Sequence, residues 1–194
     1  MNSERYENRV FKDLKITEKT VEGCEFMECT FDSCTFEDCK IIRNKFIDCQ
    51  FNSCTVISPR SKYSEMRHSE FTNCNLIGIH WAEFFPVGQI FEPIRRMNNC
   101  YLKYNTFIHM NFRKFDFSKN QMENSMFEEC NLMECKFKNC RLTATQILKC
   151  DIRKADFRDA EGYQIDITTN QLKGAKFSFP EVINLLSQLE ITID

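Results

Sequence analysis

Residues 24–54 read CEFMECTFDSCTFEDCKIIRNKFIDCQFNSC, and within this stretch a large apolar residue recurs at almost every fifth position. The same frame extends in both directions. Its centres are Phe11, Ile16, Val21, Phe26, Phe31, Phe36, Ile41, Phe46, Phe51, Val56, Ser61, Met66, Phe71, Leu76 and Trp81. Neither the 3.6-residue period of an α-helix nor the two-residue period of a half-buried strand describes this spacing. A five-residue repeat therefore determines the fold.

A second block of repeats follows in a frame that is shifted by one residue. Its centres are Leu102, Phe107, Phe112, Phe117, Met122, Phe127, Leu132, Phe137, Leu142, Ile147, Ile152, Phe157, Gly162, Ile167, Leu172 and Phe177. Only Ser61 and Gly162 among all centres are not large and apolar, whereas an apolar content of 42% would fill fewer than half of them by chance. The frames divide the chain into a first block (11–81), an interruption (82–99), a second block (100–179) and a C-terminal segment (180–194).

The cysteines share one position of this repeat, two residues before a centre. They are Cys24, Cys29, Cys34, Cys39, Cys49, Cys54, Cys74, Cys100, Cys130, Cys135, Cys140 and Cys150. The same position elsewhere holds mostly small residues, including Ser64, Ser69, Ser125, Thr145, Ala155, Ala160 and Ala175. The repeating unit is therefore small, polar, large and apolar, followed by two mostly polar residues.

This unit resembles the repeat of the pentapeptide-repeat family, in which a small residue, Asp or Asn, and Leu or Phe precede two variable residues. The matching triplets include Ala155-Asp156-Phe157, Cys130-Asn131-Leu132, Cys74-Asn75-Leu76 and Cys150-Asp151-Ile152. The resemblance covers roughly residues 11–81 and 100–179. It implies an all-β fold, a right-handed quadrilateral parallel β-helix, in one domain of residues 1–194. Each pentapeptide forms one side of a square coil, and four complete the coil.

Coils that stack at the inter-strand spacing of about 4.8 Å place residues 20 positions apart above one another. We therefore expect three ladders, formed by Phe31, Phe51 and Phe71, by Cys34, Cys54 and Cys74, and by Phe117, Phe137, Phe157 and Phe177. About eight coils would make a rod on the order of 40 Å long. An isolated coil cannot bury its core, so its stability depends on its neighbours.

The interruption at residues 82–99 contains Pro86, Gly88 and Pro93, which forbid a simple continuation of the repeat. One interpretation is a linker whose apolar residues dock back on the rod. The other is a projecting loop that contacts a partner, because such loops often carry function. In that case the contacting residues are Phe84, Phe85 and Phe91, with Arg95 and Arg96 as the charged tip.

The C-terminal segment predicts a short α-helix, because Pro180 suits the first position of a helix and an apolar stripe follows it. The stripe consists of Val182, Ile183, Leu185, Leu186 and Leu189. This helix would cap the exposed strand edges at the end of the rod. A second role is a homodimer interface, which the resemblance to Qnr-type quinolone-resistance proteins implies for this end.

Composition argues against several functions. The formal net charge is -2 and the pI is about 6.0, which provides no general attraction for nucleic acid or for an anionic membrane. No apolar run approaches the length of about 20 residues that a membrane-spanning helix needs. The first six residues, MNSERY, are polar and charged, unlike a secretory signal. We therefore expect a cytoplasmic protein that does not bind nucleic acid directly.

The same pattern predicts no metal, no cofactor and no catalytic site. Zinc sites need thiolates that converge from paired positions, whereas these cysteines repeat at intervals of five and are expected to be small buried hydrophobic residues. His68, His80 and His109 fall outside the inward positions. No phosphate-binding glycine motif or nucleophile elbow occurs, so we expect a protein that is not an enzyme.

Charge is uneven along the sequence. Between positions 21 and 39 there are six acidic residues, Glu22, Glu25, Glu28, Asp32, Glu37 and Asp38, and no Lys or Arg. Lys136, Lys138, Arg141, Lys149, Arg153, Lys154 and Arg158 later outnumber the neighbouring acids. Either these are ordinary solvated surfaces, or the acids form a patch about one coil tall that meets a basic groove of a partner.

The resemblance to Qnr-type proteins implies a function for such a rod. Those relatives imitate duplex DNA and bind type II topoisomerases such as gyrase, which protects the enzyme from quinolones or peptide toxins. This reading assigns a topoisomerase as the protein partner and the six acids as part of the contact. The alternative is a scaffold or interaction rod with a different partner and no topoisomerase activity, because fold does not specify function.

Overall fold

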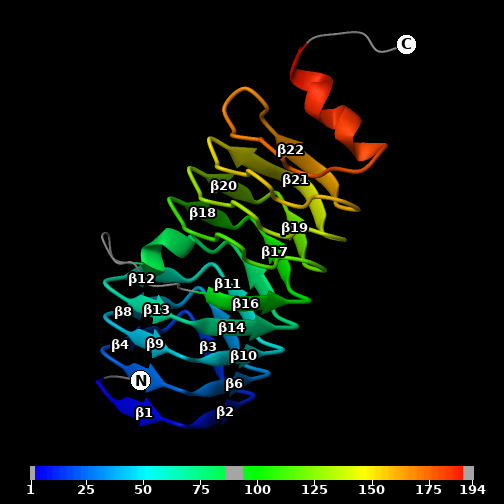
Figure 1. Cartoon of the computed structure of the whole chain (residues 1–194). Coiled ribbons are helices and arrows are strands. Elements are labelled where there is room, and N and C mark those ends of the chain that lie inside the picture. Colours follow the sequence, from blue (N-terminus) through cyan, green and yellow to red (C-terminus); the bar gives the residue numbers. More distant parts are fainter. Residues whose placement is uncertain (1–2, 86–93, 190–194) are drawn as a thin grey trace.

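The computed structural model describes residues 3–85 and 94–189 and is a right-handed parallel β-solenoid of about eight turns. Figure 1 shows a rod with the two chain ends at opposite ends. The described helices include none that is long and apolar enough to cross a membrane. The predicted fold class is therefore confirmed.

The rod has four sides, which we number in chain order. Side 1 contains β1 (Arg5–Glu7), β5 (Glu25–Met27), β9 (Lys45–Ile47) and β13 (Glu65–Arg67). Side 2 contains β2 (Val10–Lys12), β6 (Thr30–Asp32), β10 (Gln50–Asn52), β14 (Ser69–Thr72) and β16 (Ile94–Asn98). On these two sides of the second block, isolated bridges join adjacent coils. Examples are Asn131 to Asp151 on side 1 and Lys136 to Asp156 on side 2.

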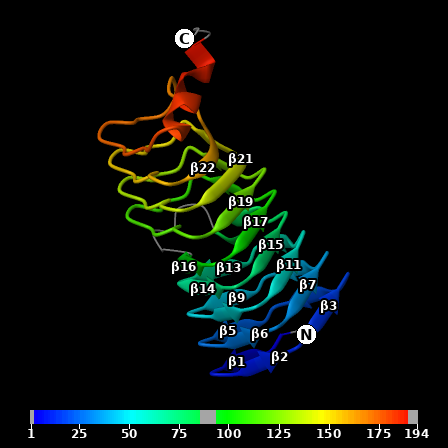
Figure 2. The same ribbon diagram turned by 90° about the vertical axis from the view of Figure 1, so that its right-hand side faces the viewer.

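Sides 3 and 4 keep regular strands in both blocks. Side 3, visible as a continuous stack in Figure 2, contains β3 (Lys15–Thr17), β7 (Thr35–Glu37), β11 (Thr55–Ile57), β15 (Asn75–Ile77), β17 (Tyr101–Lys103) and β19 (Gln121–Glu123). Side 4 contains β4 (Thr20–Glu22), β8 (Lys40–Ile42), β12 (Arg60–Lys62), β18 (Thr106–Ile108) and β20 (Met126–Glu128). The long β21 (Arg141–Leu148) and β22 (Glu161–Ile165) run from side 3 onto side 4.

The aromatic ladders have the predicted register. Phe51 pairs with Phe31 below it and with Phe71 above it, and each pair of ring centroids lies 4.8 Å apart. In the second block the Phe137 and Phe157 rings are 4.7 Å apart and nearly parallel. The predicted cysteine ladder is also present, because the Cys34 and Cys54 carbonyls each accept a strand N–H from the next coil. Each coil thus supplies both the ring contacts and the hydrogen bonds of its neighbours.

A residue with positive φ forms nearly every corner between adjacent sides. Asn8, Asp13, Asp48 and Asn73 are examples, with φ between 51° and 55°. Left-handed backbone costs a residue with a Cβ roughly 1–2 kcal/mol, which Asn and Asp tolerate better than most. The corner N–H also binds the next coil, as Asn8 N donates to Met27 O at 3.0 Å. Hydrogen bonding between coils therefore helps to offset the cost of each corner.

A β-bulge causes the shift of frame between the two blocks. Ser69 faces Ile94, 25 residues later, but Glu70 faces Arg96, so Arg95 is an extra residue in β16. For the rest of the junction between the blocks the offset is 26, as where Leu76 faces Leu102, and within the second block it is 20 again, as where Leu102 faces Met122. An offset of 25 exceeds the usual 20 by one whole repeat and would have kept the five-residue frame. The extra residue of the bulge raises the offset to 26 and so shifts the frame by one. The second block consequently resumes at Ile94, not at residue 100 as the sequence pattern indicated.

The 3-10 helix η1 (Trp81–Phe84) replaces one strand of side 4 and explains the irregular Ser61. The Ser61 N–H, which has no strand above it, donates to the Glu83 carboxylate at 2.8 Å, and the Ser61 hydroxyl donates to Glu83 O at 3.1 Å. Trp81 remains in the core and stacks on Phe107. A serine at this centre thus connects the strand ladder to a helical turn.

Two further expectations are corrected near the C-terminus. Gly162 is not an inward centre, because Tyr163 and Ile165 fill the core and face Thr145 and Ile147. Tyr163 follows Thr145 by 18 residues instead of the usual 20, so this part of the coil is two residues shorter than the part below it. The usual offset of 20 returns where Asp151 faces Gln171. The C-terminal helix, η2 (Glu181–Leu189), is a 3-10 helix rather than an α-helix. It is short and begins directly after Pro180, whose carbonyl accepts the Ile183 N–H in an i to i+3 bond.

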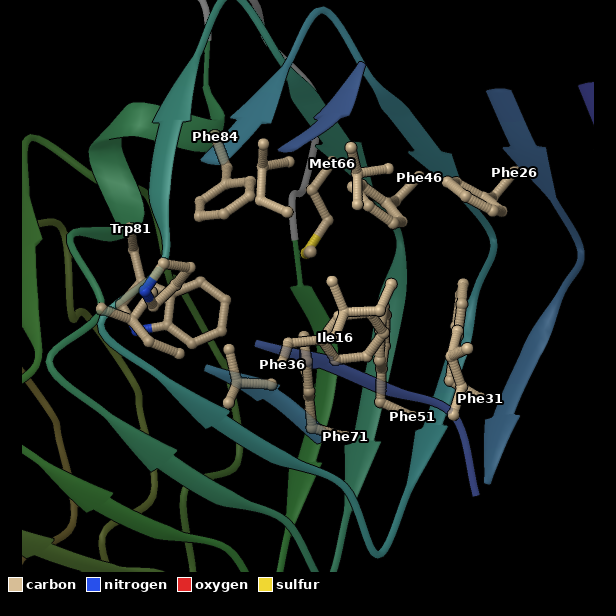
Figure 3. Close-up of a pocket in the computed structure, with 16 residues that line it drawn as sticks. Ile16, Phe26, Phe31, Phe36, Phe46, Phe51, Met66, Phe71, Trp81 and Phe84 are labelled. Atoms are coloured by element: carbon tan, nitrogen blue, oxygen red, sulfur yellow. The ribbon is translucent and has the colours of Figure 1, made fainter. Parts of the chain in front are cut away.

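The core of the first block contains a small apolar cavity. Smaller centres such as Val21, Ile41 and Val56 leave an apolar cavity of about 60 Å³. Figure 3 shows side chains of the first block pointing into it from the surrounding coils. In the second block, Phe107, Phe127, Phe137 and Phe157 are fully buried.

Replacing Phe137 by Ala should destabilise the protein by about 3–5 kcal/mol, because it removes a fully buried ring from the middle of a stack. Chemical denaturation measures this change. The matched control is Lys138→Ala, an exposed neighbour that should alter stability by less than about 0.5 kcal/mol. Equal midpoints for the two variants would contradict the inward register.

Candidate protein-binding surfaces

The six acidic residues form a ring of about one turn, from side 4 of the first coil to side 3 of the second, not a patch on one side. Glu25, Asp32, Glu37 and Glu22 lie on sides 1, 2, 3 and 4 respectively, and Glu28 and Asp38 are corners. Because consecutive pentapeptides occupy consecutive sides, a run of acids in the sequence is distributed around the rod. The structure therefore does not bring these candidates together on a single face.

Basic residues of the next coil pair with part of this ring. Arg43 Nη1 lies 3.0 Å from Glu22 Oε1, and Lys45 Nζ lies 2.6 Å from Glu25 Oε1. The hydrogen bond from Lys45 holds the pKa of Glu25 below its usual value. Exposed pairs of this kind add little stability. They do reduce the negative charge that the ring presents to a partner.

Arg95 and Arg96 are not the tip of a projecting loop. Both belong to β16, where Arg95 Nη2 lies 3.1 Å from Asp48 Oδ1 and Arg96 pairs with Glu70. The extra residue of the bulge thus reaches back across two coils to Asp48. These arginines join the resumed repeat to the first block.

The apolar candidates of the interruption have different outcomes. Phe84 is buried in the core, and Phe85 is partly buried against it. Both support the interpretation in which this segment docks back on the rod. Phe91 lies outside the described residues.

The C-terminal end divides its apolar residues between the core and the surface. Leu185 is buried, and Val182 packs against the core. Leu186 is half-buried. Ile183 and Leu189 are 38% and 43% exposed, and Phe179 is 78% exposed. Phe179 was not among the predicted interface residues, although an aromatic at a corner position, where polar residues are usual, could have revealed it.

Glu181 connects η2 to the end of the rod. Its Oε1 atom accepts the Gly162 N–H at 2.6 Å, beside the shortened part of the last coil. The helix therefore caps this end. The outward residues Phe179, Ile183 and Leu189 form what we call the end surface.

The Asp and Asn residues of the repeat motif have a clear local role on sides 1 and 2 of the second block. The Asp156 carboxylate accepts the backbone N–H of Arg158 and also binds the Arg158 guanidinium through two nitrogens, at 2.9 and 2.6 Å. This pairing lowers the pKa of Asp156 to about 2. Asp151 and Arg153 repeat the arrangement one side earlier. The Asp side chain thereby stabilises the turn that follows it.

The twelve cysteines are all free and buried. All the thiols except that of Cys24 donate to carbonyls of the preceding coil, as Cys39 Sγ does to Ile16 O at 3.0 Å. Burial raises the pKa of Cys49, Cys135 and Cys140 to about 12, so these thiols stay protonated at neutral pH. Within the described residues no group of three potential ligands is placed to hold a metal ion.

Buried asparagines are inward residues that the sequence reasoning missed. They are Asn44, Asn105, Asn120 and Asn170, which occupy the same position as the cysteines. Asn44 Oδ1 accepts the Cys24 N–H at 2.8 Å, and its Nδ2 donates to Val21 O at 2.7 Å. Their shared position with cysteine was the available signal. They bridge coils, and so they belong to the scaffold.

Comparison with known proteins agrees with this architecture. Residues 121–159 match the model of the pentapeptide repeats, with eight copies. No curated protein sequence matches the chain. A structure of a trypsin-treated variant of QnrB1, a plasmid-mediated fluoroquinolone resistance protein, is similar with a TM-score of 0.52 at 19% identity, over 100% of this chain and 98% of that one. HetL, involved in heterocyst differentiation regulation in the cyanobacterium Nostoc, has a TM-score of 0.45 at 9% identity, over 88% and 86%.

Ellman's reagent should label few thiols in the native protein and all twelve after denaturation in guanidinium, because every cysteine is buried. Absorbance at the thiolate product's wavelength gives the count. Rapid labelling of several thiols in the native protein would contradict the inward placement of the cysteines.

Acid should remove the stabilisation that Asp156 provides. Its pKa in the folded protein, about 2, is lower than the ordinary 3.8, so this contribution is complete above pH 4 and is lost as the pH falls toward 2. Thermal unfolding should show Asp156→Asn less stable than the wild type at pH 6, with the difference shrinking at pH 2.5. Asp159→Asn, at an exposed corner, is the control. A difference that does not change with pH would refute the ion-pair contribution.

Proposed function

We propose that this chain, in which residues 121–159 match the pentapeptide repeats, is a non-enzymatic rod whose outer sides bind a protein partner. The most direct support is that the interior side chains are occupied by contacts with one another and with the backbone. Its aromatic rings stack on one another, and its thiols and amides bond to backbone carbonyls. The cavity of the first block is lined by apolar side chains. Recognition is therefore assigned to the outside of the rod.

The positions of the histidines support a binding role rather than catalysis. His68 Nδ1 lies 3.5 Å from Asp48 Oδ1, and His109 Nδ1 lies 3.2 Å from Glu129 Oε2. The two pairs are at different corners of the rod. His80 bonds to the Thr106 hydroxyl. Each histidine therefore belongs to a separate contact outside the core. Twelve free, buried thiols fit a reducing compartment, so we assign the protein to the cytosol.

A type II topoisomerase is the second, more specific candidate for the partner. What favours it is the likeness to QnrB1, which extends over the whole chain and is a likeness of fold. The acidic ring and its ion pairs do not make the continuous negative stripe that close imitation of duplex DNA requires. If a topoisomerase is the partner, its recognition here depends on shape and local contacts more than on negative charge.

We also propose that two rods associate through the end surface. Phe179, Ile183 and Leu189 are large apolar residues exposed at the same end, beside the helix that caps the rod. A twofold contact would bury them in a self-complementary patch. The half-buried Leu186 would then both pack on the rod and border the interface.

DNA supercoiling by purified gyrase, titrated with this protein in the presence and absence of ciprofloxacin, tests the topoisomerase candidate. Inhibition, or rescue from the drug, is the outcome expected for a topoisomerase partner. Bovine serum albumin at the same concentration is the control for nonspecific effects. Unchanged supercoiling at excess protein would eliminate this candidate and leave the binding rod with a different partner.

Replacing Ile183 by Asp should halve the molar mass in solution, because it places a charge in the proposed contact. Light scattering coupled to gel filtration measures the mass. Gln164→Asp adds the same charge at an exposed position of the last coil outside the end surface and should leave the dimer intact. Leu186→Asp tests the border of the surface. A dimer that survives both Ile183→Asp and Leu186→Asp would exclude the end surface as the interface.

A further inference from the structure

Charge in the second block is segregated around the rod axis. Sides 1 and 2 comprise residues 111–119, 131–139, 151–159 and 171–179. They carry ten bases, Arg113, Lys114, Lys119, Lys136, Lys138, Arg153, Lys154, Arg158, Lys173 and Lys176, against five acids, Asp116, Glu134, Asp151, Asp156 and Asp159. Sides 3 and 4 of the same coils, residues 101–109, 121–129, 141–149 and 161–170, have three bases and five acids. We call the basic half the basic edge.

The acids of the basic edge are largely engaged within the protein. The side chains of Asp151 and Asp156 are only 19% and 18% exposed, because each is covered by the arginine two residues later. Glu134 lies between Arg113 and Lys114. These carboxylates serve the turns and the neighbouring coil. They offer little negative charge to a ligand.

Five lysines of the basic edge form no ion pair in the part of the chain that the structure describes. One of them, Lys176, is bridged to Asp156 in the next coil. The other four are Lys119, Lys138, Lys154 and Lys173. All four are exposed. Their placement is unfavourable for the isolated rod, because Lys154 N donates to Lys173 O at 3.1 Å and Lys119 N donates to Lys138 O at 3.4 Å, so like charges lie on adjacent coils. The bridged column beside them alternates instead, with Asp116, Lys136, Asp156 and Lys176 in order. The alternating column stabilises the rod, whereas the four lysines have no such structural role.

The surroundings limit what an anionic ligand can be. On the same two sides of the first block, residues 4–13, 24–33, 44–53 and 64–73 contain nine acids and five bases. A long polyanion lying along the rod would therefore meet like charge beyond the second block. Among the described residues of the basic edge, Phe179 at its far end is the one exposed aromatic side chain, whereas a platform for successive bases needs several. A short anionic segment fits this edge better than extended nucleic acid.

We propose that the basic edge is the docking surface for a short acidic segment of a protein partner. This inference rests on the proposed function and specifies which part of the rod the partner contacts. Lysines on flexible stems suit the carboxylates of an extended acidic peptide, and steering by charge would accelerate the encounter. Binding would also relieve the repulsion between the stacked lysines.

The test is fluorescence anisotropy with a fluorescein-labelled deca-glutamate peptide as the probe, at low and at physiological salt. The variant K138E/K154E/K173E reverses three charges on the basic edge. The matched control, K12E/K15E/K19E, reverses three exposed lysines of the first block and changes the net charge equally. We expect the edge variant to weaken binding by roughly tenfold or more and the control by no more than roughly twofold, with added salt weakening the wild-type complex.

Thermal unfolding shows whether both variants remain folded, which we expect because all six lysines are exposed. Equal loss in the two variants, or no binding of the peptide by the wild type, would overturn the proposal. A 20-base-pair duplex that binds more tightly than the peptide would also overturn it, in favour of a nucleic-acid ligand. If an identified protein partner binds the edge variant as tightly as the wild type, the basic edge is not the docking surface, and the proposed binding function stands. If the wild type binds no protein at all, the proposed function itself is refuted.

Discussion

Each coil of this protein depends on direct contact with the coils beside it. A five-residue side is too short to bury a core or to satisfy its own backbone, so the strand N–H groups, the corner N–H groups and the aromatic rings all bond or stack across coils. The constraint explains why one position of the repeat must be large and why another must be small. It also explains how cysteine, serine and asparagine can share the small position, because each reaches a carbonyl of the coil before it. The interior is committed to stacking, and only the outward positions are free to differ.

That commitment sets how much could be predicted from the sequence. The five-residue period followed from spacing. The ladders such as Phe31 to Phe71 and the burial of the cysteines followed once the family resemblance implied four repeats per coil, because an inward residue then has the same neighbours in every coil. The interruption did not, since a bulge at Arg95 and a helical turn at Trp81–Phe84 depend on contacts with earlier coils that no local pattern encodes. For the same reason Gly162 appeared to be a centre while Tyr163 is the residue that fills the core.

The surface was harder to predict than the core. A cluster of acids that is compact in the sequence becomes a ring in space, whereas the lysines of the basic edge are spread over more than 50 residues and converge on two sides. Residues close in the sequence therefore lie on different sides of the rod, whereas residues about 20 positions apart are neighbours on its surface. Candidate contacts must be sought among residues one coil apart. At the end surface, Ile183 was predicted from the apolar stripe, whereas Phe179 was not among the predicted residues.

The continuous ladder of side 3 has a mechanical consequence. At the interruption the side 4 ladder gives way to the η1 turn between β12 and β18, whereas the hydrogen-bonded run from β3 through β15 and β17 to β21 passes it without a gap (Figure 2). Stretching side 3 at this point would break hydrogen bonds between strands, whereas the same step on side 4 passes through a helical turn. Strand pairing on side 3 therefore sets the spacing between the two blocks.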